Sequence, residues 1–118
     1  MLARKFRITK QTDFDAFFGA KFKKAQGRNF TTANFIFKSK KNELNRPRFG
    51  FVVSNKIDNR STVRNRIKRQ VREIIRLNLE KFKQPVDCLF VFKKGAEKLA
   101  FADLEKELMF IFKTTRLL

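Results

Sequence analysis

The stretch VRNRIKRQVREIIR, residues 63–76, constrains the fold more than any other part of the chain. Its apolar residues recur at spacings of three and four, which places them on one face of an α-helix. These residues are Val63, Ile67, Val71, Ile74 and Ile75. We expect Ser61 or Thr62 to cap the helix at its N-terminus. Pro85 prevents continuation, so the helix should end by about Phe82. A helix with one apolar stripe has to bury that stripe against a second layer of structure.

Apolar patterns on either side of this helix predict the other layers. Alternating residues predict strands near 31–39 and 48–55, and the unbroken run VDCLFVF predicts a buried strand near 86–92. Helical spacing predicts a first helix over about 10–19 and a last helix over about 101–115. The chain therefore alternates between helical and extended segments.

The expected first helix has recognisable ends. Thr12 stands three residues before Asp15, which is the spacing of a capping box, and Gly19 marks the expected stop. Its apolar face is made by Phe14, Phe17 and Phe18. The basic segment that follows, residues 21–30, has room for a short edge strand.

The order of elements, α-β-β-(β)-α-β-α, predicts an α+β fold: a single-domain sandwich of about three helices on one mostly antiparallel sheet. We expect the segments 31–39 and 48–55 to pair as an antiparallel hairpin. Apolar residues on both faces of 48–55 predict a central strand. A length of 118 residues, of which 42% are hydrophobic, fits one domain over residues 1–118.

The balance of charge points to an acidic partner. The chain has 29 lysines and arginines against 11 acidic residues, a net charge of +18. Self-repulsion of this size makes sense if the partner is a polyanion, with nucleic acid as the first choice and an anionic membrane surface as the second. No apolar run approaches the roughly 20 residues of a membrane-spanning helix, and the basic start lacks the apolar stretch of a signal peptide. We expect a cytoplasmic protein.

Few residues are suited to catalysis. The chain has no histidine, its carboxylates are scattered, and its only cysteine, Cys88, lies in an apolar run typical of a buried core thiol. One cysteine without histidine makes no zinc site. The composition therefore predicts neither a protein-based catalytic centre nor a metal bound by the protein alone.

The long helix carries its cations in a row. At 100° per residue, Arg64, Lys68, Arg72 and Arg76 follow one another along the border of the apolar stripe. Asn65 and Arg69 lie beside this row, whereas Arg66 points elsewhere. Like charges four residues apart destabilise a helix by roughly 0.2–0.5 kcal/mol per pair, so the row favours an anionic backbone lying along it. The helix N-terminus at 62–65 adds free N–H groups suited to a phosphate.

RNRIKRQVRE, residues 64–73, resembles the signature segment of the protein subunit of bacterial ribonuclease P. Residues 12–18 (TDFDAFF) and 46–56 (RPRFGFVVSNK) resemble two further segments of that family. VDCLFVFKKGA and the closing amphipathic helix are also similar, so the resemblance covers nearly the whole chain in order.

This resemblance implies a fold with a left-handed βαβ crossover, which is a rare hand for such a connection. It also implies that a partner RNA, the ribonuclease P RNA, cleaves the 5′ leader from precursor tRNA. Mg²⁺ would be held mainly by that RNA and the substrate. The protein would bind the RNA through the signature helix and hold the leader in a cleft between the first helix and the sheet. No obligate protein partner is predicted.

Family positions matched residue by residue predict two sets of site residues. With Arg76 added from the row, the predicted RNA-binding residues are Lys56, Arg64, Asn65, Arg66, Lys68, Arg69, Arg72 and Arg76. The predicted leader-cleft residues are Phe14, Phe18, Phe35, Phe37, Val52 and Ser54. Phe17 is left for the core, and Asn55 and Asp58 depart from the residues usual in the family.

Two other classes of function are open. A structural RNA-binding protein, such as a small ribosomal protein or an RNA chaperone, would share the charge and bind RNA without recognising a leader. A stand-alone nuclease would cleave RNA by itself, which the lack of histidine and of clustered carboxylates argues against.

Overall fold

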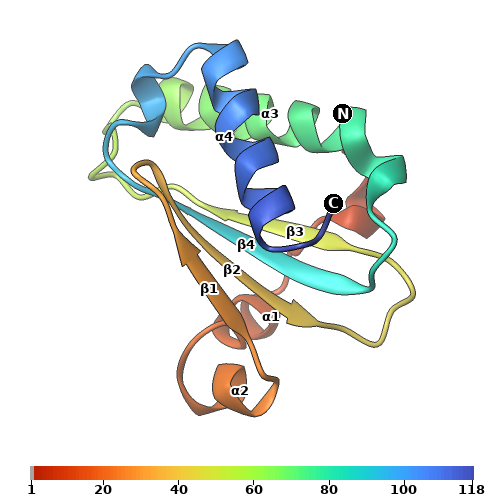
Figure 1. Cartoon of the computed structure of the whole chain (residues 1–118). Helices are drawn as coiled ribbons and strands as arrows, with labels where there is room; N and C mark the ends of the chain where they lie inside the picture. Colours follow the sequence, from red (N-terminus) through yellow and green to blue (C-terminus); the bar gives the residue numbers. More distant parts are fainter. Residues whose placement is uncertain (1) are drawn as a thin grey trace.

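A single four-stranded sheet organises the molecule, as Figure 1 shows for the computed structural model, which describes residues 2–118. The strands are β1 (Arg28–Thr31), β2 (Phe35–Lys41), β3 (Arg48–Val52) and β4 (Val86–Phe92). Their order across the sheet is β1-β2-β4-β3. β2 is antiparallel to both β1 and β4, and β3 is parallel to β4. The sheet is therefore mostly antiparallel, as expected, and β1 is the predicted short edge strand.

The predicted hairpin between 31–39 and 48–55 is wrong, because β4 lies between β2 and β3. β4 is buried along almost its whole length, which suits a central strand, whereas β3 lies at the end of the sheet. The outer edge of β3 is covered by the N-terminal segment, where the Ile8 N–H donates to the Phe49 carbonyl oxygen over 2.9 Å. This cover explains why an edge strand has apolar residues on both faces.

Helices cover both faces of the sheet (Figure 1). The two long helices, α3 (Ser61–Asn78) and α4 (Phe101–Thr114), lie on one face, and the two short ones, α1 (Gln11–Asp15) and α2 (Gly19–Lys24), lie on the other. Three single 3-10 turns complete the elements: Arg4–Phe6, Leu79–Lys81 and Ala96–Lys98. The β3–α3–β4 unit joins two neighbouring parallel strands, which is the crossover whose left hand the resemblance predicts.

Each helical layer has its own apolar core. The larger core lies between the sheet and the long helices, and it buries the apolar stripes of both, except that Val63 of the predicted α3 stripe is half-buried. From α3 these are Ile67, Val71, Ile74 and Ile75, and from α4 they are Leu104, Leu108, Ile111 and Phe112. The smaller core is formed by Ile8, Phe17, Phe22 and Leu89. Phe17 is fully buried there, which confirms its prediction as a core residue.

The predicted first helix differs from the structure at its end. It breaks after Asp15, and Gly19, the expected stop, instead begins α2 with a φ of 68°. A glycine adopts this left-handed conformation without the steric cost other residues meet, so the chain turns sharply and starts a second short helix. The predicted caps are also wrong, because Lys10 precedes α1 and Arg60 precedes α3, and neither makes a side-chain capping bond within the described chain.

Within residues 2–118, no helix is long and apolar enough to cross a bilayer.

Candidate nucleic-acid interface

The cationic row of α3 runs along the β3 end of the sheet. We call it the α3 row, and its members are Arg64, Lys68, Arg72 and Arg76. The Arg72 guanidinium lies over the Phe51 ring at 5.5 Å, which joins the helix to β3. Arg64 and Lys68 are half-buried on the same border, and Arg76 is exposed at the far end. The row therefore lies where helix and sheet meet, in agreement with the helical-wheel prediction.

Arg7 adds a cation to this surface that the sequence reasoning missed. It lies in the N-terminal segment, bridged to Phe49 at the edge of β3. The Nε atoms of Arg7 and Arg72 are both buried, and neither finds a hydrogen-bond partner among residues 2–118. Burial, and then the charge of Arg7, lower the pKa of Arg72. Two like charges without a carboxylate form a place that a bound anion would stabilise.

Several predicted RNA-binding residues are already engaged within the protein. Arg64 donates to the Asp58 carbonyl oxygen over 2.9 Å, and Arg66 donates to the Glu97 carbonyl oxygen over 2.8 Å. Arg66 thus points away from the row, as predicted from its angle. Arg76 pairs with Glu73 at 2.6 Å, so part of its charge is compensated.

The remaining predicted contacts, Lys56, Asn65 and Arg69, are all exposed. Among residues 2–118 these three side chains make no hydrogen bond or ion pair, and their contact with RNA stays a prediction.

The N-terminus of α3 opens onto a hollow of about 540 Å³. Arg60, Lys94 and Lys98 join Arg66 around it. Asp58 and Glu97 also line the hollow, so four cations face two carboxylates. With the helix dipole added, this end of α3 keeps an excess of positive charge, which fits the predicted phosphate contact.

Asp58, one of the departures from the family pattern, organises the turn before α3. Its carboxylate accepts from the Arg60 backbone N–H over 2.9 Å and from the Arg60 guanidinium over 3.0 and 2.9 Å. These hydrogen bonds, the guanidinium's first, lower the pKa of Asp58. Asn55, the other departure, is exposed in the same loop. Asp58 thus holds in its own loop a cation that would otherwise be free.

A second surface lies on the opposite face, beside α1. The strand register places Ile36, Val91 and Val52 next to one another across β2, β4 and β3. Phe14 is half-buried beside this row, and Phe18 is 51% exposed. These five residues form the surface where the resemblance predicts the leader cleft, and we therefore call this surface the α1 cleft.

The chemistry of the α1 cleft is both apolar and cationic. The Lys38 ammonium lies 5.0 Å from the Phe18 ring centre. Gly50 lets Phe14 approach the sheet, since a Cβ at this position would lie 3.0 Å from the Phe14 ring. An exposed ring beside a cation suits an unstacked base and its phosphate.

The prediction that Phe35 and Phe37 line the cleft is wrong. Both are fully buried in the larger core, on the α3–α4 side of the sheet. Alternation along β2 then directs Ile36 and Lys38 to the α1 side, and these are the cleft residues that sequence reasoning missed. Alternation along β2 showed which residues share a face of the sheet. It did not show whether α3 and α4 or α1 would cover that face.

The positions of the other predicted cleft residues are compatible with lining a leader-binding surface. Phe14, Phe18 and Val52 lie in the α1 cleft, and Ser54 is exposed just beyond β3. Whether any of them contacts a leader stays a prediction.

A buried ionic network holds α1 against the sheet. Asp87 of β4 is 1% exposed and accepts from Arg48 over 2.9 and 2.8 Å and from Asn42 over 2.8 Å. Arg48 also reaches Asp13 of α1 at 3.3 Å. Burial alone would raise the pKa of Asp87, but the hydrogen bonds from Arg48 and Asn42 and the charges of Arg48 and Lys40 outweigh it and lower the pKa.

Comparison with known proteins decides between the possible classes. The family described as Ribonuclease P matches residues 2–116. This chain belongs to the ribonuclease P protein family. It is 33% identical over 116 residues to the ribonuclease P protein component of Streptococcus pneumoniae serotype 4, covering 98% of this chain and 89% of the relative.

Solved structures of the family share the fold. The RNase P protein of Thermotoga maritima superposes with a TM-score of 0.77 at 27% identity, covering 92% of this chain and 96% of that one. The Staphylococcus aureus RNase P protein gives a TM-score of 0.82 at 24% identity, covering 95% and 96% of the two chains. The family assignment supports a role in tRNA 5′ processing and does not favour the general structural RNA-binding alternative.

Two features that a protein-based nuclease could use are a metal site and an accessible nucleophile. No group of three or more histidine, cysteine, aspartate or glutamate residues among residues 2–118 is placed to hold a metal ion. Cys88 is fully buried, and burial raises the pKa of its thiol, so it is no accessible nucleophile.

Proposed function

We propose that this chain binds the ribonuclease P RNA through α3 and holds the 5′ leader of precursor tRNA in the α1 cleft. The observation that carries the proposal is the presence of two distinct surfaces on opposite sides of one sheet. One offers cations in a row for a phosphate backbone, and the other offers an exposed ring beside a lysine for an unpaired strand.

In this proposal the RNA subunit performs the cleavage. The protein reduces repulsion between the phosphates of the RNA and those of the substrate, which strengthens the binding of both substrate and Mg²⁺ by the RNA. Mg²⁺ would be held mainly by RNA oxygens, the hard ligands this ion prefers. The proposal needs no further protein partner and places the complex in the cytoplasm.

The direct test compares precursor tRNA with and without its 5′ leader. With the cognate RNA present, the protein should strengthen binding of the leader-bearing precursor and have little effect on the leaderless form. A general RNA-binding protein would strengthen both equally, and that outcome would contradict leader recognition.

A further inference from the structure

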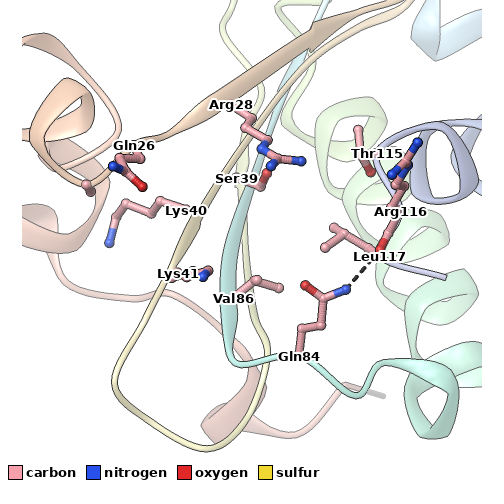
Figure 2. Close-up of a pocket in the computed structure, with 11 residues that line it drawn as sticks. Gln26, Arg28, Ser39, Lys40, Lys41, Gln84, Val86, Thr115, Arg116 and Leu117 are labelled. Carbon is pink, nitrogen blue, oxygen red and sulfur yellow. Dashed lines mark hydrogen bonds between the residues drawn. The ribbon is translucent and has the colours of Figure 1, made fainter.

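A cavity of about 330 Å³ lies away from both surfaces described above, where the end of the chain meets the sheet (Figure 2). It is bounded by β1, β2, the start of β4 and the segment after α4. We call it the C-terminal pocket, and the side chains that matter to its chemistry are Arg28, Ser39, Lys41 and Arg116.

The C-terminal pocket is lined by cations without acids. Four of its lining residues are basic, namely Arg28, Lys40, Lys41 and Arg116, and none is aspartate or glutamate. Lys40 is directed to Asp87 at 3.4 Å. Arg28, Lys41 and Arg116 have no carboxylate within ion-pair distance anywhere in residues 2–118. Three uncompensated cations around one hollow repel one another unless an anion lies between them.

Ser39 adds a hydroxyl to these charges. The residue lines the pocket and is only 7% exposed. The β1–β2 register places Arg28 directly opposite Ser39. Lys41 follows two residues later on the same face of β2. The strand register therefore places a hydroxyl donor beside two of the three cations, where it could donate to an oxygen of a bound anion.

The far wall of the pocket is fixed in place. Arg116 has a φ of 62°, which turns the chain back after α4. The Leu117 N–H then donates to the Phe112 carbonyl oxygen over 2.9 Å, and the Gln84 side-chain amide donates to the Arg116 carbonyl oxygen over 2.9 Å. Figure 2 shows Arg116 and Thr115 facing Arg28 and Ser39 across the pocket. The cavity is therefore held by hydrogen bonds between three segments.

The C-terminal pocket is separate from the α3 row. It lies beside β1 and β2, whereas Arg72 contacts Phe51 of β3, at the other end of the strand order. Three strand spacings of roughly 4.8 Å separate the two ends of the sheet. One phosphate cannot contact both surfaces, so a phosphate bound in the pocket would be distinct from any bound by the α3 row.

We propose that the C-terminal pocket is a phosphate-binding site. Arg28 and Arg116 supply planar guanidinium groups that can each donate two hydrogen bonds to phosphate oxygens, Lys41 supplies a point charge and Ser39 supplies a hydroxyl donor. The phosphate comes either from an RNA backbone beyond the α3 contact or from a free phosphate compound. The site goes beyond the proposed function and does not depend on it.

Binding is tested first with inorganic phosphate and the protein alone. Backbone amide NMR shifts of residues around Arg28, Ser39 and Arg116 should change saturably as phosphate is added at constant ionic strength. Arg28→Gln or Arg116→Gln should weaken this binding roughly tenfold or more, because a charge-assisted hydrogen bond is lost. Lys106→Gln is the matched control, since it removes one charge from an exposed position outside the pocket.

A second experiment, the salt dependence of RNA binding, identifies the source of the phosphate. If the ligand is RNA, Arg28→Gln should lower the slope of log K against log salt for the cognate RNA by roughly one. If the ligand is a free phosphate compound, that slope stays unchanged while phosphate saturation is lost. The proposal would be overturned if the wild-type protein showed no saturable phosphate binding and no substitution in the pocket changed the salt slope of RNA binding.

Discussion

At the scale of single residues, Asp87 connects the sheet to α1 through Arg48. It is a buried carboxylate that receives donors from Arg48, Asn42 and Lys40, and Arg48 carries the connection on to α1. Breaking a buried ion pair by removing one partner costs about 3–5 kcal/mol, because the other charge is left without compensation. Asp87→Asn should therefore reduce the free energy of unfolding by an amount in this range near neutral pH.

Acidification should make this difference smaller. The pKa of Asp87 is lowered in the folded state, so its contribution is present above the unfolded pKa of about 3.9 and is lost as the pH falls towards the folded pKa. Urea unfolding at several pH values measures the gap between wild type and Asp87→Asn. Asp15→Asn, at an exposed carboxylate, is the control. A gap that stays constant down to pH values below about 3.9 would contradict the role of the ionised carboxylate.

A separate prediction concerns the cations of the α3 row. Arg64→Ala and Lys68→Ala should each weaken binding to the cognate RNA and lower the salt slope by roughly one ion, because one phosphate contact is lost. Filter binding over a range of salt concentrations measures both quantities. Lys106→Ala, which removes an exposed charge on α4, should leave the slope nearly unchanged. Equal slopes for all variants would show that Arg64 and Lys68 do not contact phosphate.

At the scale of elements, the segment that follows α1 contains one residue that packs in the core and a neighbour that is available for recognition. Phe17 is fully buried, whereas its neighbour Phe18 is 51% exposed beside Lys38. Phe17→Ala should lower the free energy of unfolding by about 3–5 kcal/mol, and Phe18→Ala should change it far less.

Phe18→Ala should instead weaken binding of the leader. If a base stacks on Phe18, Phe18→Ala should weaken binding of leader-bearing precursor tRNA by roughly 1–3 kcal/mol and leave the leaderless form unaffected. The measurement is the affinity of the reconstituted complex for both substrates. Equal losses for the two substrates would remove Phe18 from leader recognition.

The elements themselves were predictable to different degrees. The stripes of α3 and α4 follow from local spacing, so their buried residues were predicted correctly. The faces of β2 were not, because alternation is symmetric and both Phe35 and Ile36 are apolar. Only the position of the helical layers determines that Phe35 and Phe37 are core residues and Ile36 belongs to the α1 cleft.

For the whole molecule, strand order was the feature that sequence reasoning could not reach. Neighbouring strands in sequence usually pair, but here β4 inserts between β2 and β3 after the long α3 crossover. Arg7 was missed for the same reason, since its position beside Arg72 depends on the N-terminal segment covering the edge of β3. Long-range contacts of this kind leave no local pattern.

Under the proposed function, the topology would allow one small protein to hold two RNA segments at once. The α3 row and the α1 cleft lie on opposite sides of the same sheet, so a net charge of +18 is distributed over separate surfaces. Binding at one surface does not block the other.

The most direct test is cleavage of leader-bearing precursor tRNA by the cognate ribonuclease P RNA at low Mg²⁺ concentration, with and without this protein. The protein should raise the cleavage rate strongly under these conditions, and it should cleave nothing when the RNA is left out. A rate with the RNA that the protein does not change would contradict the proposed function.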